Sequence, residues 1–148
     1  MNADRAEMET QLKKHCVSLL RNQGFKGSFP DLYRDVDGFV SLINFQFFRS
    51  GGSFCVNISY ADKERENIDF RKETEPKKLK VYQTRVRVRL GSTNHFRDKW
   101  FSFGKTSYDE YRGKPRPASE IVNEINRLIL EVAVPWWNDK AGDKIYRI

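Results

Sequence analysis

The sequence predicts an α+β fold in which an antiparallel sheet of about five strands packs against an N-terminal and a C-terminal helix. Apolar residues recur at helical spacing near both ends of the chain, whereas apolar and polar residues alternate in its central region. Turn dipeptides such as Asp37-Gly38 and Gly51-Gly52 separate the alternating runs. The 148 residues suit a single domain that buries its own core without disulfides or metal.

The first segment predicts a helix that ends near Asn22. Gly24 then provides a C-cap, and Phe25 is expected to fold back onto the last helical turn. The apolar residues at helical spacing are Met8, Leu12, Cys16, Leu19 and Leu20.

Strands follow in the middle of the chain. The alternation predicts strands over residues 32–34, 39–48, 53–60, 81–90 and 100–103. Residues 61–80 are charged and contain Pro76, so they are expected to form an insertion or a long loop.

A second helix is expected to begin near residues 117–119, after a loop over 108–117. Pro135 is expected to end it, Trp136 and Trp137 to pack against the end of the sheet, and residues 138–148 to form a tail. Its apolar stripe consists of Ile121, Val122, Ile125, Leu128, Ile129 and Val132.

The composition narrows the class of protein. A net charge of +7, from 27 Lys and Arg against 20 Asp and Glu, favours anionic partners. Two cysteines and two histidines without metal-site spacing argue against a zinc site, and no cofactor is predicted. The N-terminus is too polar for a signal peptide and no apolar run could cross a bilayer, so we expect a cytoplasmic protein with reduced thiols.

Strand alternation assigns side chains to the two faces of the sheet. The face expected to bury against the helices carries Ile43, Phe45, Phe47, Phe54, Val56, Ile58, Val86, Val88 and Leu90. The opposite face carries Asn44, Gln46, Cys55, Asn57, Ser59, Arg85, Arg87 and Arg89. If these strands are neighbours, one face combines amides with a row of arginines.

This polar face has two interpretations. The simpler one is a solvated strand face whose arginines pair loosely with neighbouring side chains. The functional one is a binding surface for nucleic acid or an acidic protein, because guanidinium and amide groups suit phosphate and carboxylate. The residues assigned to such a surface are Arg85, Arg87, Arg89, Asn44, Gln46 and Asn57.

Other candidate chemistry is weaker. His15 and Cys16 are helix neighbours whose side chains diverge, so they do not form a nucleophilic pair. One alternative function is an interaction or immunity-type protein that binds through exposed aromatics, namely Tyr108, Tyr111 and Trp137. The weakest alternative is an enzyme with its site around His95 and the arginines. An open sheet edge also allows a homodimer.

Six short segments occur along the chain in the same order as similar segments in a known family. They are Gln23-Gly24-Phe25-Lys26, Ile43-Asn44-Phe45-Gln46, Ser53-Phe54-Cys55-Val56-Asn57-Ile58, Arg89-Leu90-Gly91, Trp100-Phe101-Ser102-Phe103 and Val134-Pro135-Trp136-Trp137. Together they resemble domain-of-unknown-function family 4304, an uncharacterised and mainly bacterial group. The resemblance implies a small cytoplasmic α+β domain and carries over no catalytic residue. The matched polar positions Asn44, Gln46, Asn57 and Arg89 belong to the predicted polar face.

Overall fold

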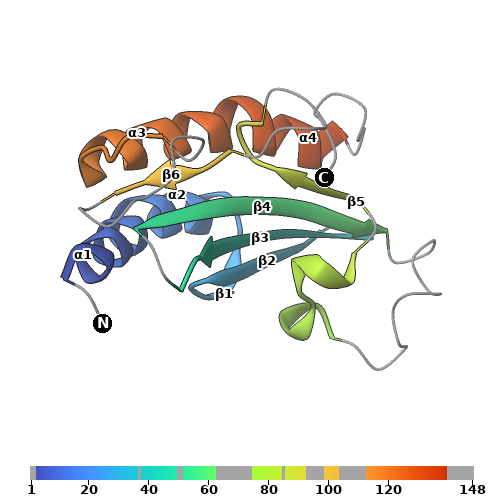
Figure 1. The fold of residues 1–148 in the computed structure, drawn as a ribbon. Coiled ribbons are helices and arrows are strands. Elements are labelled where there is room, and N and C mark those ends of the chain that lie inside the picture. The colour runs from blue at the N-terminus through green and yellow to red at the C-terminus, as the bar shows by residue number, and fades with distance from the viewer. Residues whose placement is uncertain are drawn as a thin grey trace.

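A computed structural model describes residues 3–36, 38–49, 52–62, 75–84, 86–92, 99–103 and 113–139. These residues form two layers, an antiparallel sheet and a layer of helices that covers one of its faces (Figure 1). Helices from the two ends of the chain contact each other within the helical layer. The predicted α+β fold, with a helix at each end of the chain, is therefore confirmed.

One helical rod lies at the N-terminal end of the described residues. It consists of α1 (Ala3–Gln11), the π-helical segment η1 (Leu12–Val17) and α2 (Ser18–Asn22). Gly24 follows with φ of 93°, a conformation that residues with a side chain rarely adopt. The N–H of Phe25 donates to the carbonyl of Leu20 over 3.0 Å, and the Phe25 ring is buried. The predicted end of this helix and the return of Phe25 are both confirmed.

In the described ranges the sheet has six strands, of which five follow the order β1-β2-β3-β4-β5. Their bounds are β1 Lys26–Ser28, β2 Asp31–Val36, β3 Phe39–Phe47, β4 Ser53–Asp62, β5 Val86–Arg89 and β6 Phe101–Ser102. All of the pairings are antiparallel. Since β3 pairs along one whole edge of β4, strands β5 and β6 share its other edge.

A second helical rod lies across the sheet near the end of the chain. It comprises α3 (Ala118–Leu128), the π-helical segment η5 (Ile129–Ala133) and α4 (Val134–Asp139). The expectation that Pro135 ends the helix is wrong, and Asn138 is helical rather than part of a tail. Pro135 is the second residue of α4, directly after a π-helical segment, where a missing N–H is tolerated.

The main core lies between the sheet and the two rods. From the predicted face, it contains the buried residues Ile43, Phe45, Phe54, Val56, Ile58, Val88 and Leu90, with Phe47 partly buried against them. The Val86 side chain lies outside the described part of the structure. Trp136 and Trp137 are both 1% exposed, and the Trp137 indole N–H donates to the carbonyl of Ser59 over 3.0 Å. The two tryptophans therefore join the C-terminal rod to the centre of the sheet.

The predicted strand over residues 81–90 is wrong in its first part. Residues 75–84 contain two 3-10 helices, η2 (Pro76–Lys78) and η3 (Val81–Gln83), and the strand begins only at Val86. Leu79 and Val81 are each 6% exposed because they pack on the sheet face that the helices leave open. They form a second apolar cluster there with Val40, Leu42 and Ala61. Burying these two side chains takes the chain away from the extended path that its alternation suggested.

An ion cluster links the middle of α3 to the segments that flank β6. The Glu124 carboxylate pairs with the Lys99 ammonium over 2.9 Å and with the Arg116 guanidinium. Burial acts to raise the pKa of Glu124, but the hydrogen bonds and charges of Arg116 and Lys99 hold it below its ordinary value. This carboxylate thus ties α3 to the segments on either side of β6.

Two expectations about compartment and thiols can be compared with the structure. Within the described residues, no helix is long and apolar enough to cross a membrane. Cys16 and Cys55 are both buried and form no disulfide with each other, as expected of reduced thiols.

We expect Leu79→Ala to lower the free energy of unfolding by about 2 kcal/mol, because it removes buried methyl groups and leaves a cavity. Urea denaturation monitored by tryptophan fluorescence measures this change. Lys78→Ala, at the exposed neighbouring position, should change the free energy by less than about 0.5 kcal/mol. Identical unfolding of the two variants would show that residues 75–84 do not pack on the sheet.

Glu124→Gln should destabilise the protein in a pH-dependent way. Because the pKa of Glu124 is lowered in the folded state, its carboxylate stabilises the fold above the ordinary pKa of 4.5. This contribution is lost as the pH falls through the lower pKa of the folded protein. Urea unfolding should therefore separate wild type from variant at neutral pH, and the difference should shrink in acid. A difference independent of pH would contradict the assignment.

Candidate functional site

A row of polar side chains crosses the face of the sheet that the helices leave open. Asp31 in β2 is the register partner of Asn44 in β3, Asn44 that of Asn57 in β4, and Asn57 that of Arg89 in β5. Register partners on antiparallel strands have Cβ atoms about 5 Å apart, within reach of one another. The apolar alternation that fills the main core therefore also aligns these four side chains.

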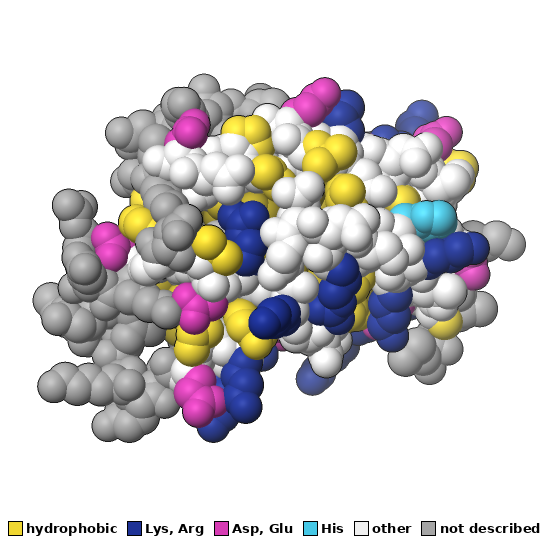
Figure 2. Space-filling view, turned by 180° about the vertical axis from the view of Figure 1, so that it is seen from behind, with side chains coloured by type: hydrophobic (Ala, Val, Ile, Leu, Met, Phe, Trp, Pro, Cys, Tyr) yellow, Lys and Arg dark blue, Asp and Glu magenta, His cyan; other side chains and the backbone are white. Residues whose placement is uncertain are grey.

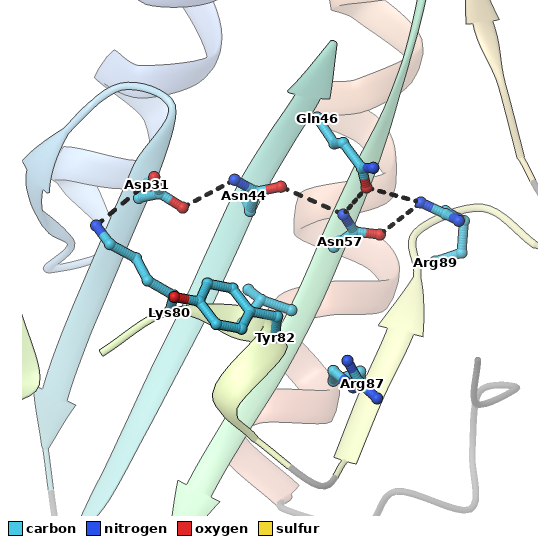
Figure 3. Close-up of a pocket in the computed structure, with 9 residues that line it drawn as sticks. Asp31, Asn44, Gln46, Asn57, Lys80, Tyr82, Arg87 and Arg89 are labelled. Atoms are coloured by element: carbon cyan, nitrogen blue, oxygen red, sulfur yellow. Dashed lines mark hydrogen bonds and ion pairs between the residues drawn. The ribbon is translucent and has the colours of Figure 1, made fainter. Parts of the chain in front are cut away.

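Hydrogen bonds connect the row from end to end (Figure 3). The Arg89 Nη1 donates to Asn57 Oδ1 over 2.8 Å, and Asn57 Nδ2 donates to Asn44 Oδ1 over 3.3 Å. Asn44 Nδ2 then donates to Asp31 Oδ1 over 2.8 Å. Gln46 Oε1 accepts from Asn57 over 2.9 Å and from Arg89 over 3.4 Å. We call Asp31, Asn44, Gln46, Asn57 and Arg89 the polar row.

The polar row has a direction. Arginine can only donate hydrogen bonds and an ionised carboxylate can only accept them, so the two ends of the row differ in kind. The guanidinium turns the Asn57 carbonyl toward itself and the Asn57 amide toward Asn44. Asn44 in turn presents its amide to Asp31. The orientation of each amide is thereby fixed by its neighbours, and Asn57, only 8% exposed, is held at the centre.

The polar row forms the floor of an open cavity of about 560 Å³. Lys80, Val81 and Tyr82 from the segment with the two 3-10 helices form one wall, and Arg87 lies beside Arg89 on β5 (Figure 3). Hydrogen bonds within the wall hold its shape. The Lys80 N–H donates to Gln83 Oε1 over 2.8 Å, and the Thr84 hydroxyl donates to the Val81 carbonyl over 2.6 Å.

Charge is distributed unevenly around this cavity. The Lys80 ammonium lies 3.6 Å from Asp31 Oδ2, so one end of the polar row is balanced. At the other end, Arg87 is exposed, and its side chain makes no hydrogen bond or ion pair with the described residues. Tyr82 is 73% exposed beside these groups. The cavity therefore combines a cationic end, an ordered set of amides and an accessible aromatic ring.

The sequence analysis located part of this site. Five of its six assigned residues, Asn44, Gln46, Asn57, Arg87 and Arg89, line the same cavity, whereas Arg85 lies outside the described residues. It missed Asp31, Lys80 and Tyr82. The only signal for the last two was the apolar pair Leu79 and Val81, whose burial brings their neighbours onto the sheet.

The other sequence candidates lie elsewhere. Burial raises the pKa of Cys16 to about 12, which keeps the thiol protonated and unreactive, and His15 is exposed next to it. The expectation that Trp137 is an exposed anchor is wrong, because its ring is buried in the main core. His95, Tyr108 and Tyr111 lie outside the described residues.

Two further observations concern the surface. On the side of the molecule turned away in Figure 1, Lys and Arg side chains gather in the middle and lower part of the described surface, with few acidic groups between them (Figure 2). Among the described residues, no group of three His, Cys, Asp or Glu side chains could hold a metal ion.

Comparison with known proteins gives one match. The profile of a family described as "Domain of unknown function (DUF4304)" matches residues 16–139. This range includes every residue of the polar row and both tryptophans of α4. No curated protein and no solved structure matches the chain.

The polar row leads to a prediction about stability. Asn57→Ala should lower the free energy of unfolding by about 1 to 3 kcal/mol, because it leaves hydrogen-bonding groups of Asn44, Gln46 and Arg89 without their partner. Chemical denaturation measures the change. Arg87→Gln is the matched control and should unfold like wild type, because Arg87 contacts none of the described polar groups. Equal stability of Asn57→Ala and wild type would mean that the row does not hold together in solution.

Proposed function

The chain belongs to the family described as domain of unknown function DUF4304, and we propose that it is a non-enzymatic binding module for nucleic acid. The ligand binds in the cavity above the polar row, and its phosphates contact Arg87 and Arg89. The observation that carries this proposal is the exposed Arg87 guanidinium, without a partner among the described residues, at the cationic end of an ordered polar cavity.

Electrostatics supports an anionic ligand. Residues two apart on a strand are about 6.6 Å apart, so the charges of Arg87 and Arg89 repel by roughly 0.6 kcal/mol in bulk water. The repulsion is about four times larger at an effective dielectric constant of 20. A phosphate between the two guanidinium groups would turn this cost into attraction. Asp31 does not compensate the pair, since Lys80 and Asn44 already engage its two oxygens.

Tyr82 favours nucleic acid over an acidic protein. Its ring is 73% exposed on the wall of the cavity, close enough to the arginines to line the same hollow. Proteins that bind single strands combine cations that contact the backbone with aromatic rings on which bases stack. An acidic peptide would use the cations but has no planar base to place on the ring.

The cavity also supports binding rather than catalysis. The described residues that line it include no histidine, cysteine, serine or threonine. The one carboxylate among these described lining residues is Asp31, and Asn44 and Lys80 engage its two oxygens. What the lining offers is hydrogen bonds, charge and an aromatic surface.

We expect fluorescence anisotropy to detect binding of a labelled single-stranded oligonucleotide, and Arg87→Glu to abolish it. Two to three phosphate contacts with a single strand would weaken wild-type binding by roughly seven- to twentyfold between about 50 and 200 mM salt. Thermal unfolding of Arg87→Glu should match wild type, because the side chain is exposed and lacks a described partner. A collapse in stability would instead make the arginine structural.

Matched controls test separately the contribution of charge, the contribution of base stacking and the class of ligand. Lys14→Glu introduces the same charge change at an exposed position of the helical layer and should bind like wild type. Tyr82→Leu should weaken single-strand binding by about 1 to 3 kcal/mol and duplex binding much less. If an acidic peptide binds and oligonucleotides do not, the ligand is an acidic protein and not nucleic acid. Absence of binding by both probes at low salt would end the proposal.

A further inference from the structure

A second unusual arginine lies on the opposite face of the sheet, under the helices. Arg34 points from β2 toward the helical layer, and its register partner is Ser41 in β3. Its guanidinium carbon lies 5.2 Å from the centre of the Phe25 ring and 5.8 Å from that of Trp137. The cation thus sits beside the aromatic part of the main core, where burial lowers its pKa.

The hydrogen bonds of Arg34 do not neutralise its charge. Nη1 donates to the Gln23 carbonyl over 3.2 Å, and Nη2 donates to Asn138 Oδ1 over 3.1 Å. Both acceptors are neutral, and no carboxylate of the described residues forms an ion pair with the guanidinium. Nε is buried and has no hydrogen-bond partner among the residues that the structure describes. A guanidinium has five N–H groups, so a set of donors that includes Nε remains unused.

The structural contacts explain the position of Arg34 but not the unused donors. The Gln23 carbonyl lies at the C-terminal end of α2, where the helix dipole favours a positive charge. The aromatic faces of Phe25 and Trp137 favour a cation as well. Neither interaction accepts the proton of Nε, and leaving a buried donor unsatisfied is costly. An anion bound at this donor would both satisfy it and compensate the charge.

A cavity of about 390 Å³ adjoins the guanidinium. Gln23, Ser41 and Asn138 contribute polar groups to its wall, whereas Val36, Phe39 and Trp137 contribute apolar surface. These residues come from the end of α2, from β2 and β3, and from α4, so the cavity exists only where the two helical rods meet the sheet. The space is therefore polar around one cation and apolar elsewhere.

We propose that this cavity, the Arg34 pocket, binds an organic carboxylate. A planar carboxylate matches the fork formed by Nε and a terminal nitrogen of arginine, and its single charge matches the single cation in the wall. The apolar residues would contact the rest of the molecule. A small free acid and the C-terminal carboxylate of a peptide share this chemistry. The proposal is independent of nucleic-acid binding, because the two cavities lie on opposite faces of the sheet.

The direct test is NMR of the Arg34 Nε–H and the Trp137 indole N–H during titration with sodium benzoate, with sodium chloride at equal ionic strength as reference. We expect both signals to shift and saturate, and the melting temperature to rise with benzoate but not with neutral benzamide. Arg34→Lys keeps the charge but loses the planar fork, and should bind at least about tenfold more weakly. Arg34→Met should not respond at all.

Further measurements distinguish a small free acid from a peptide C-terminus and provide a result that does not depend on the folding of a variant. Arg87→Gln changes the other face and should bind benzoate like wild type. A peptide with a free C-terminus that shifts the same signals, while its amidated twin does not, would identify a chain terminus as the source. The wild-type titration remains decisive if Arg34→Met fails to fold. The proposal is overturned if chloride reproduces the shifts, if inorganic phosphate saturates the signals in place of benzoate, or if folded Arg34→Met responds like wild type.

Discussion

The fold depends on one constraint, the period-two alternation of side chains along β3 and β4. Ile43, Phe45 and Phe47 alternate with Asn44 and Gln46, so burying the first set under the helices places the second set on the open face. A shift of one residue in the pairing would expose the core and bury the amides. The hydrophobic effect therefore fixes the register, and the register aligns the polar row.

The arginines on the two faces of the sheet have different surroundings. On the open face, Arg89 is part of a hydrogen-bonded row that ends at Asp31, and Arg87 remains accessible to solvent. On the helix face, Arg34 is packed beside Phe25 and Trp137, and within the described part of the chain it donates only to neutral acceptors. Water screens the charges of Arg87 and Arg89, whereas the partly buried surroundings of Arg34 screen its charge less. This difference underlies the two proposals, a polyanion on the open face and a small monoanion in the Arg34 pocket.

Sequence reasoning failed where local preference and long-range packing disagree. Residues 81–90 alternate like a strand, but Val81 begins a 3-10 helix and, together with Leu79, is buried against Val40 and Leu42. Pro135 normally ends a helix, but the preceding π-helical segment lets the rod continue to Asp139. Trp137 was expected to pack against the sheet, and its buried ring does so; only the alternative that made it an exposed anchor is wrong. For Leu79, Val81 and Trp137 the deciding contacts come from residues far away in the chain, whereas for Pro135 the deciding feature is the helical segment directly before it.

The sequence by itself determined the α+β class, both helices, the main strands, and the face on which Asn44, Asn57, Arg87 and Arg89 lie. These features follow from local periodicity, because spacings of two and of three to four residues set which side chains share a face. The tertiary structure alone decided that Asp31, Lys80 and Tyr82 complete the cavity, and that Arg34 meets Gln23 and Asn138. Those contacts join segments far apart in sequence, and only the packing of the whole core brings them within hydrogen-bonding distance.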